Sequence, residues 1–238
     1  MYQNYIFDLY GTLVDIETDE WQDSFWESVA DFFTGFGATY TAAELHDRYG
    51  ELVKESEHAL SIKSGLPVSD VEIQLDHVFE TLFLEKGYKP SKEDIVNTAH
   101  FFRKVSTKYI KLFPGALELL QRLKKAGKKV YLLSNAQQLF TENEMRDMCI
   151  YDMFDGVFYS SDYGVKKPCV IFYEALFNQE KLEKDNSVMI GNDCIADIKG
   201  AHDFGIASMY VHTKQSSPLK GPLPKDCKVL KTIGDVYR

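Results

Sequence analysis

The sequence has little of what marks a secreted, membrane-spanning or metal-clustered protein. Its four cysteines lie far apart with no C-x-x-C pair, so neither a zinc knuckle nor a disulfide framework is predicted, and the thiols are expected to stay reduced. The six histidines show no metal-ligand spacing. No stretch approaches the ~18 continuous apolar residues of a membrane span, and the N-terminus has no positively charged region followed by an apolar one. We therefore expect a cytoplasmic protein with no membrane partner.

The sequence also lacks an excess of basic residues. Its net charge is -9, whereas a nucleic-acid partner requires a basic stripe, so none is expected. Residues 16–60 contain eleven acids and only two bases, Arg48 and Lys54. We interpret these acids as the solvated faces of amphipathic helices, with an acidic partner-facing lobe as the alternative.

Apolar residues make up 45% of the chain and aromatics 13%, which suffices for a substantial core. Residues 18–111 are predicted to form four consecutive helices with no strand between them. The first carries aromatic residues at helical spacing from Trp21 to Phe36 and ends near Gly35 and Gly37. Three capping-box patterns are predicted to begin the other helices: Thr41 with Glu44, Ser69 with Glu72, and Ser91 with Asp94. The four helices would pack as a small bundle.

After residue 115 the pattern changes to helices alternating with short β-rich runs, at residues 130–133, 157–159, 187–190 and 207–211. Such alternation predicts an α/β fold, a Rossmann-like parallel sheet with helices on both faces. The isolated opening run, residues 5–7, is expected to join this sheet. The chain would then comprise a core domain (residues 1–15 and 105–238) and an inserted helical domain (residues 16–104). Residues 213–225 are predicted to be an exposed loop.

Polar clusters follow four of the predicted strands: Asp8 to Thr12, Ser134 with Asn135, Lys167 before Pro168, and Asp193 with Asp197. Ligands of an open parallel sheet bind outside the carboxyl ends of its strands. Each cluster alone is also typical of an ordinary turn or helix cap. Together they would supply a carboxylate nucleophile, a hydroxyl, an ammonium and further carboxylates, the composition that phosphoryl transfer requires.

These motifs resemble those of the haloacid dehalogenase (HAD) superfamily of hydrolases. DLYGTLVD is similar to its first motif, SNA to the second, KKP to the third, and GNDCIAD followed by IKGAHDFG to the fourth. They occur in the family's order across nearly the whole chain. The helical segment is similar to the cap that many members insert between the first and second motifs, and such a lobe could close over the site and exclude water.

The resemblance implies a role for each matching residue. Asp8 would attack the substrate to form a covalent aspartyl intermediate, which water then hydrolyses. Ser134 and Lys167 would hold the transferring group, and Lys167 is chosen over Lys166 because it precedes the proline. Further roles are implied for other residues: substrate binding by Tyr10, Thr12 and Asn135, and Mg²⁺ binding by Asp8, Asp193, Asp197 and the Tyr10 backbone carbonyl.

Tyr10 departs from the phosphatase pattern, because the family's phosphatases usually have a second aspartate two residues after the nucleophile, acting as general acid and base. A phenol with a pKa near 10 is a poor substitute at neutral pH. Tyrosine here is instead similar to the family's 2-haloacid dehalogenases, in which halide leaves without protonation and no metal is needed. In those enzymes a cap arginine grips the substrate, and here Arg48 and Arg103 are the arginines of the helical segment.

The leading prediction is a hydrolase, a Mg²⁺-dependent phosphatase acting on a small phosphorylated metabolite. Because the usual second aspartate is replaced by Tyr10, a substrate with a good leaving group, such as an acyl or aryl phosphate, is favoured. Closely placed acids after one strand favour the phosphatase, because a cation must offset their charge. A metal-free 2-haloacid dehalogenase is the alternative. A binding or regulatory protein that has lost fast chemistry is the second alternative, since Cys169 also departs from the aspartate common after the family's Lys-Pro. The oligomeric state stays open.

Overall fold

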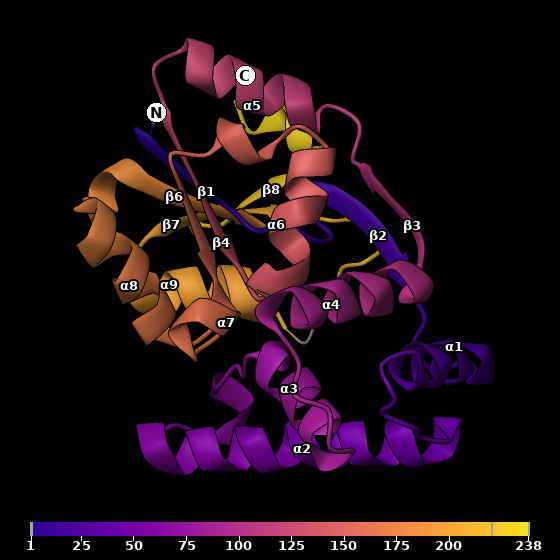
Figure 1. Cartoon of the computed structure of the whole chain (residues 1–238). Helices are drawn as coiled ribbons and strands as arrows, with labels where there is room; N and C mark the ends of the chain where they lie inside the picture. Colours follow the sequence, from indigo (N-terminus) through magenta and orange to yellow (C-terminus); the bar gives the residue numbers. More distant parts are fainter. Residues whose placement is uncertain (1, 220, 238) are drawn as a thin grey trace.

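The computed structural model describes residues 2–219 and 221–237. Its centre is a parallel sheet of six strands in the order β5-β4-β1-β6-β7-β8 (Figure 1). The strands are β1 Asn4–Phe7, β4 Lys129–Ser134, β5 Gly156–Tyr159, β6 Ser187–Gly191, β7 Ala207–Val211 and β8 Lys228–Leu230. The mixed α/β class and the parallel sheet are as predicted, and the opening strand does join the later ones. The short edge strand β8 had no recognisable sequence signal.

Helices cover both faces of the sheet because successive side chains of a strand point to opposite sides. On β1, Tyr5 and Phe7 enter one apolar cluster, and Ile6 enters the other. The first cluster packs against α5 (Ala116–Lys125) and α6 (Gln138–Asp147), and the second against α8 (Val170–Glu180) and α9 (Gly200–Phe204). A short helix α7 (Ser160–Tyr163) follows β5, and a π-helical turn (Cys194–Lys199) leads into α9.

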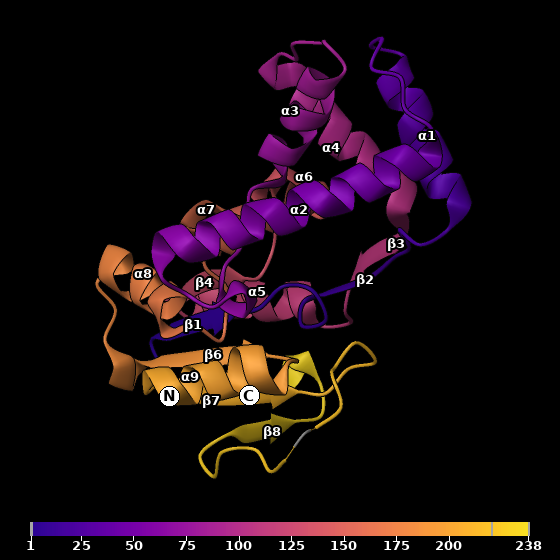
Figure 2. The ribbon, with the colours of Figure 1, turned by 90° about the horizontal axis from the view of Figure 1, so that it is seen from below.

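Four helices inserted between β1 and β4 form a second body, which we call the insertion. They are α1 Asp23–Thr34, α2 Ala42–Ser64, α3 Leu75–Glu85 and α4 Lys92–Ser106. Figure 1 shows α1, α2 and α3 gathered below the sheet, and in Figure 2 α1 and α3 lie at the opposite side of the molecule from β7 and β8. The insertion has an apolar cluster of its own, rich in aromatic rings, among them Phe33 stacked on Phe83 at 4.3 Å between centroids.

The helix starts are partly as predicted. Thr41 and Ser91 each form a capping box, with Glu44 and Asp94 respectively. The third predicted capping box is wrong. Ser69 lies in a 3₁₀ turn (Val68–Asp70), and α3 begins five residues later, at Leu75, because Glu72 is drawn into contacts with the sheet domain.

Two other expectations about this region are wrong. The helical prediction ran to residue 111, but α4 ends at Ser106 and the chain continues as β3 (Thr107–Leu112), which pairs antiparallel with β2 (Val14–Thr18). Trp21 was expected on the apolar face of the first helix, yet it precedes α1 and is 89% exposed. The β2–β3 pair joins the insertion to the rest of the chain. Of the predicted domain boundaries, residue 16 lies within β2 and residue 104 near the end of α4, and the division into domains stays a prediction.

No helix within the described ranges, residues 2–219 and 221–237, is long and apolar enough to cross a membrane.

Candidate active site

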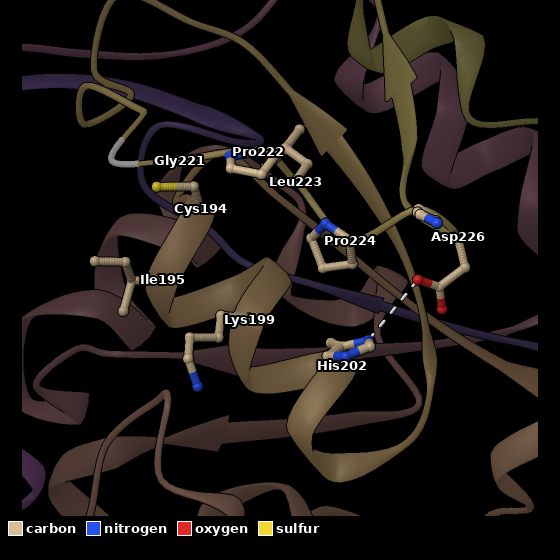
Figure 3. A pocket seen from close by; sticks show the side chains of 10 residues that line it. Cys194, Ile195, Lys199, His202, Gly221, Pro222, Leu223, Pro224 and Asp226 are labelled. Carbon is tan, nitrogen blue, oxygen red and sulfur yellow. Dashed lines mark ion pairs between the residues drawn. The ribbon is translucent and has the colours of Figure 1, made fainter.

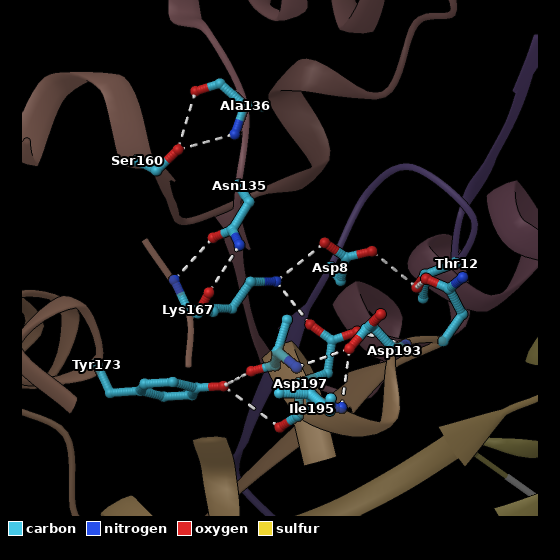
Figure 4. A network of polar contacts seen from close by, with 12 residues as sticks. Asp8, Thr12, Asn135, Ala136, Ser160, Lys167, Tyr173, Asp193, Ile195 and Asp197 are labelled. Carbon is cyan, nitrogen blue, oxygen red and sulfur yellow. Dashed lines mark hydrogen bonds and ion pairs between the residues drawn. The ribbon is translucent and has the colours of Figure 1, made fainter. Parts of the chain in front are cut away.

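The predicted site residues come together because β1, β4 and β6 are neighbours in the sheet. Asp8 directly follows β1, Ser134 is the last residue of β4, and Asp193 follows β6 by two residues. In a parallel sheet these carboxyl ends share one edge, so residues from distant parts of the sequence meet there. Lys167 reaches the same place from the loop between α7 and α8 (Figure 4).

The Lys167 ammonium lies at the centre of the site. Its Nζ donates to Asp8 Oδ1 at 2.9 Å and to Asp197 Oδ1 at 2.7 Å (Figure 4). The side chain is buried, as are those of both aspartates. Lys167, and not its neighbour Lys166, is therefore the lysine that the fold brings to Asp8.

The charges of this cluster are strongly coupled. Burial alone would lower the pKa of Lys167, but Asp197 and Asp8 outweigh it, so the pKa lies above its ordinary value and the amine is charged. Burial raises the pKa of Asp197 above its usual range and Asp8 adds to the rise, while Lys167 opposes it. One ammonium thus faces two buried carboxylates.

The first motif is fitted closely against the loop after β6. Thr12 Oγ1 lies 2.9 Å from Asp8 Oδ2 and 3.1 Å from Asn192 Oδ1. Gly11 has a φ of +84°, and a Cβ there would come within 2.4 Å of Asn192 Nδ2, so glycine is required. Asn192 had no predicted role, and its contact with Thr12 arises only because β1 and β6 are paired.

The second motif holds Lys167 through its backbone. Asn135 Nδ2 donates to the Lys167 carbonyl at 2.9 Å, and its Oδ1 accepts from the Lys167 N–H at 2.8 Å (Figure 4). These reciprocal bonds fix the lysine's backbone, so Asn135 acts on Lys167 in this structure. Ser134 is buried at the end of β4.

Tyr10 makes contacts that the sequence did not predict. Its hydroxyl donates to the Glu144 carboxylate and lies 3.0 Å from Thr141 Oγ1, both on α6. Arg103 of α4 pairs with Glu144 at 2.6 Å and lies 5.4 Å from the centroid of the Tyr10 ring. Burial and then Glu144 raise the pKa of Tyr10 well above its usual range near 10, so the phenol is a neutral hydrogen-bond donor.

The other arginine of the helical segment, Arg48, has a side chain that is 28% exposed, against 18% for Arg103. Arg48 of α2 pairs with Glu51, Glu55 and Glu85, all within the insertion. Of the two, Arg103 is therefore the one beside Tyr10.

Oxygen donors suited to Mg²⁺ are present at the site. Asp8 and Asp197 place two carboxylates side by side, each giving one oxygen to Lys167 Nζ, and Mg²⁺ commonly takes one or two carboxylates together with substrate phosphate oxygens. Asp193 faces elsewhere: its Oδ1 accepts from the Ile195 and Ala196 N–H groups, and its Oδ2 from the Ser217 hydroxyl. Within the described residues, no three His, Cys, Asp or Glu side chains form a ready metal cage. The donor chemistry fits a cation held jointly with substrate.

A cavity of about 720 Å³ lies elsewhere, between the start of the π-helical turn and the loop around Pro222 (Figure 3). Its lining includes Cys194, Lys199 and His202 but none of the predicted site residues. It is therefore distinct from the Asp8 cluster.

Similarity to known proteins agrees with this geometry. The chain is 22% identical over 209 residues to the glyceraldehyde 3-phosphate phosphatase of Methanothermobacter thermautotrophicus, covering 81% of this chain and 92% of that one. It is 30% identical over 116 residues to the haloacid dehalogenase-like hydrolase domain-containing protein 3 of Xenopus laevis, covering 48% and 47% of the two chains.

Solved structures share the fold over almost the whole chain. The 2-haloacid dehalogenase of Pseudomonas syringae superposes with a TM-score of 0.63 at 17% identity, covering 99% of this chain and 96% of that one. A Bacillus subtilis HAD-hydrolase bound to magnesium gives a TM-score of 0.57, also at 17% identity, with 99% and 97% covered. The profile of the haloacid dehalogenase-like hydrolases matches residues 2–205. The chain belongs to this family of hydrolases.

Proposed function

We propose that this hydrolase is a Mg²⁺-dependent phosphatase acting on a small phosphorylated metabolite through a covalent intermediate on Asp8. The observation that carries the proposal is the Lys167 ammonium bound between Asp8 and Asp197 at the carboxyl edge of the sheet. A nucleophilic carboxylate beside a fixed positive charge is the arrangement needed to attack a phosphoryl group and to stabilise the charge of its transition state.

In the proposed reaction, a carboxylate oxygen of Asp8 bonds to phosphorus while the bond from phosphorus to the leaving oxygen breaks. Water then attacks the aspartyl phosphate, releasing inorganic phosphate and regenerating the carboxylate. Lys167 offsets negative charge in both steps, and Thr12 holds the other Asp8 oxygen in place. When bound, Mg²⁺ would be held by Asp8, Asp197 and the Tyr10 carbonyl and would supply further positive charge for the phosphate oxygens. Asp193 would join these ligands only after its carboxylate leaves the Ile195 and Ala196 N–H groups and the Ser217 hydroxyl.

Tyr10 bears on the kind of phosphate. Its hydroxyl is engaged by Glu144 and its raised pKa keeps it neutral, so it is unsuited to act as the general base. A substrate that leaves without protonation, an acyl or aryl phosphate, suits such a site. The phosphatase named among the relatives supports phosphate ester chemistry for this chain, at 22% identity.

As part of this proposal, residues 16–104 act as a cap over the site. Asp8, Lys167 and Asp197 are all at most 8% exposed with the insertion in its present place. Substrate entry therefore requires movement of the insertion or of the adjoining loops, as in many enzymes that exclude water during reaction.

The first test is phosphate release from acetyl phosphate and p-nitrophenyl phosphate, with Mg²⁺ and with a chelator. We expect release that needs Mg²⁺ and is abolished by Asp8→Asn. The adjacent lysines provide a matched pair: Lys167→Ala should lower kcat by about 10²- to 10³-fold, the scale of losing one charge-stabilising group. Lys166→Ala should leave kcat within about threefold, since Lys167 and not the half-buried Lys166 bonds Asp8 and Asp197, and substitutions away from such contacts usually have small effects. Release that persists with the chelator, or in Asp8→Asn, would contradict the mechanism.

The alternative, a 2-haloacid dehalogenase, is favoured by Tyr10 and by Arg103 beside it. In this reaction Asp8 would displace halide from carbon. Chelator-resistant halide release from 2-chloropropionate, with no phosphate release, would favour it over the phosphatase. Binding of phosphate without turnover of either substrate class would instead favour the regulatory protein.

A further inference from the structure

One stretch of the insertion, residues 70–75, reaches back to the loop that carries Lys167. Val71 and Val165 form an antiparallel bridge, and both are almost completely buried. On either side of it, the Lys166 N–H donates to the Asp70 carbonyl at 2.9 Å and the Glu72 N–H to the Gly164 carbonyl at 3.2 Å. The middle of the insertion is thus joined by backbone bonds to the residues immediately before Lys167.

Side chains join the same stretch to the loop after β4. Gln137 Nε2 donates to Glu72 Oε1 at 3.0 Å and to the Ile73 carbonyl at 2.8 Å, and its Oε1 accepts from the Leu75 N–H at 3.1 Å. Gln137 therefore uses both of its amide hydrogens and its oxygen on the insertion. The Gln137 side chain makes no capping bond to its own helix, α6. Its Oε1 instead accepts from the first N–H of α3, a donor that has no partner within that helix.

Glu72 extends the contact to α7. Its Oε2 lies 3.3 Å from the Ser160 hydroxyl, and Ser160 Oγ accepts from the Ala136 N–H at 2.9 Å (Figure 4). Ala136 follows Asn135, the residue that holds the Lys167 backbone. Hydrogen bonds from Glu72 to Ser160 and on to Ala136, followed by the peptide bond to Asn135, therefore link the insertion to the part of the chain that places Lys167.

We propose that residues 70–75 are a positioning element of the active site, which holds the Asn135 loop and the Lys167 loop in their mutual register. The site is then fully assembled only when the insertion is seated on the sheet domain. The expected effect on turnover rests on the proposed function. The expected effect on the positions of the two loops does not depend on it. A shift of about 1 Å at a reacting group can cost about 10²-fold in rate, so hydrogen bonds this far from the reacting atoms are sufficient to matter.

The test uses two adjacent glutamines of the full-length protein. Gln137→Ala removes the three bonds to the insertion, whereas Gln138 is exposed and its side chain contacts Glu142 at 3.2 Å. With acetyl phosphate and Mg²⁺ we expect Gln137→Ala to lower kcat about 10- to 100-fold with KM changed less than about threefold, because positioning acts on the transition state. Gln138→Ala should match the parent. Glu72→Ala should also lower kcat, and Glu72→Gln, which keeps an acceptor, should recover part of the loss.

A second measurement does not depend on turnover. The Lys167 N–H donates to Asn135 and not to the insertion. Its hydrogen exchange therefore reports whether loss of a contact with the insertion loosens the bond between the Asn135 loop and the Lys167 loop. We expect faster exchange at this amide in Gln137→Ala and Glu72→Ala, and parent-like exchange in Gln138→Ala. If the parent turns over no phosphate, the proposed function fails while this measurement still decides the inference. Parent-like exchange at Lys167 in both Gln137→Ala and Glu72→Ala would overturn the inference. If the parent enzyme is active, a parent-like kcat in these two variants would overturn it as well.

Discussion

At the scale of single residues, Tyr10 shows what local sequence can and cannot reveal. Its departure from the phosphatase pattern was visible in the first motif. Its partners were not, because Glu144 and Thr141 are more than 130 positions away and Arg103 belongs to the insertion. Only the packing of α4 and α6 against the first motif brings these groups together.

Tyr10→Phe is predicted to lower stability without changing the form of the pH–rate profile. Removing the hydroxyl leaves the buried Glu144 carboxylate with one donor fewer, which should cost about 1 kcal/mol or more of unfolding free energy. Because the pKa of Tyr10 is raised above 10, the phenol stays neutral between pH 5 and 9, so its loss removes no titrating group there. Urea unfolding and kcat/KM across this pH range would measure both effects. Disappearance of one limb of the profile would show that the phenol is a catalytic acid or base.

At the scale of elements, the capping boxes show how one signal can be right twice and wrong once. Thr41 and Ser91 begin helices that the sequence located well. Ser69 has the same local pattern, but its third residue, Glu72, is bonded to Gln137 and Ser160 and is unavailable as a cap. A tertiary contact with the sheet domain overrides the local preference.

This difference predicts unequal effects for similar substitutions. Thr41→Ala should cost about 1 kcal/mol of unfolding free energy, the usual value of an N-cap. Ser69→Ala should cost less than about 0.5 kcal/mol, because among the residues that the structure describes its hydroxyl contacts the neighbouring Asp70 and caps no helix. Chemical denaturation of both variants alongside the parent would compare them. Equal losses would show that Ser69 stabilises the chain in some other way.

Much of the sheet was predictable, because buried strands followed by turn residues repeat along the second half of the chain. β3 was not, since residues 107–111 were predicted to be the end of a helix and their partner strand, β2 (Val14–Thr18), lies on the far side of the whole insertion in the sequence. For the site, the motif residues Asp8, Asn135, Lys167 and Asp197 were identified and do lie together. The contributions of Glu72, Gln137 and Glu144 arise from contacts between the insertion and the sheet domain, which no local pattern encodes.

At the scale of the whole molecule, the two bodies have separate apolar clusters, and some side chains pack in the cluster of the other body. Phe140 belongs to α6 of the sheet domain, yet it lies in the cluster of the insertion, parallel to Phe102 at 6.4 Å between ring centroids. Together with the Arg103–Glu144 pair, it fixes α4 to α6. Both an apolar contact and an ion pair therefore hold the insertion against the sheet domain.

Phe140→Ala is predicted to loosen the insertion selectively. The substitution should cost about 3 kcal/mol or more, as for other buried aromatic truncations. Phe154→Ala is the matched control: this ring is 9% exposed against 8% for Phe140, but it packs in the sheet domain's own cluster. Hydrogen exchange along α4 should accelerate in Phe140→Ala more than in Phe154→Ala. Equal acceleration in the two variants would show that the ring has no special part in seating the insertion.

The β2–β3 pair carries a consequence for how such a protein can diversify. The chain leaves the sheet domain along one strand and returns along its antiparallel neighbour, with Thr18 paired to Thr107. The two ends of the 88 intervening residues, 19–106, are therefore held side by side whatever lies between them. A lineage could lengthen, shorten or replace this module without changing the connections of the strands next to Asp8, Ser134 and Asp193. Substrate preference could then change while the residues at the carboxyl edge of the sheet stay the same.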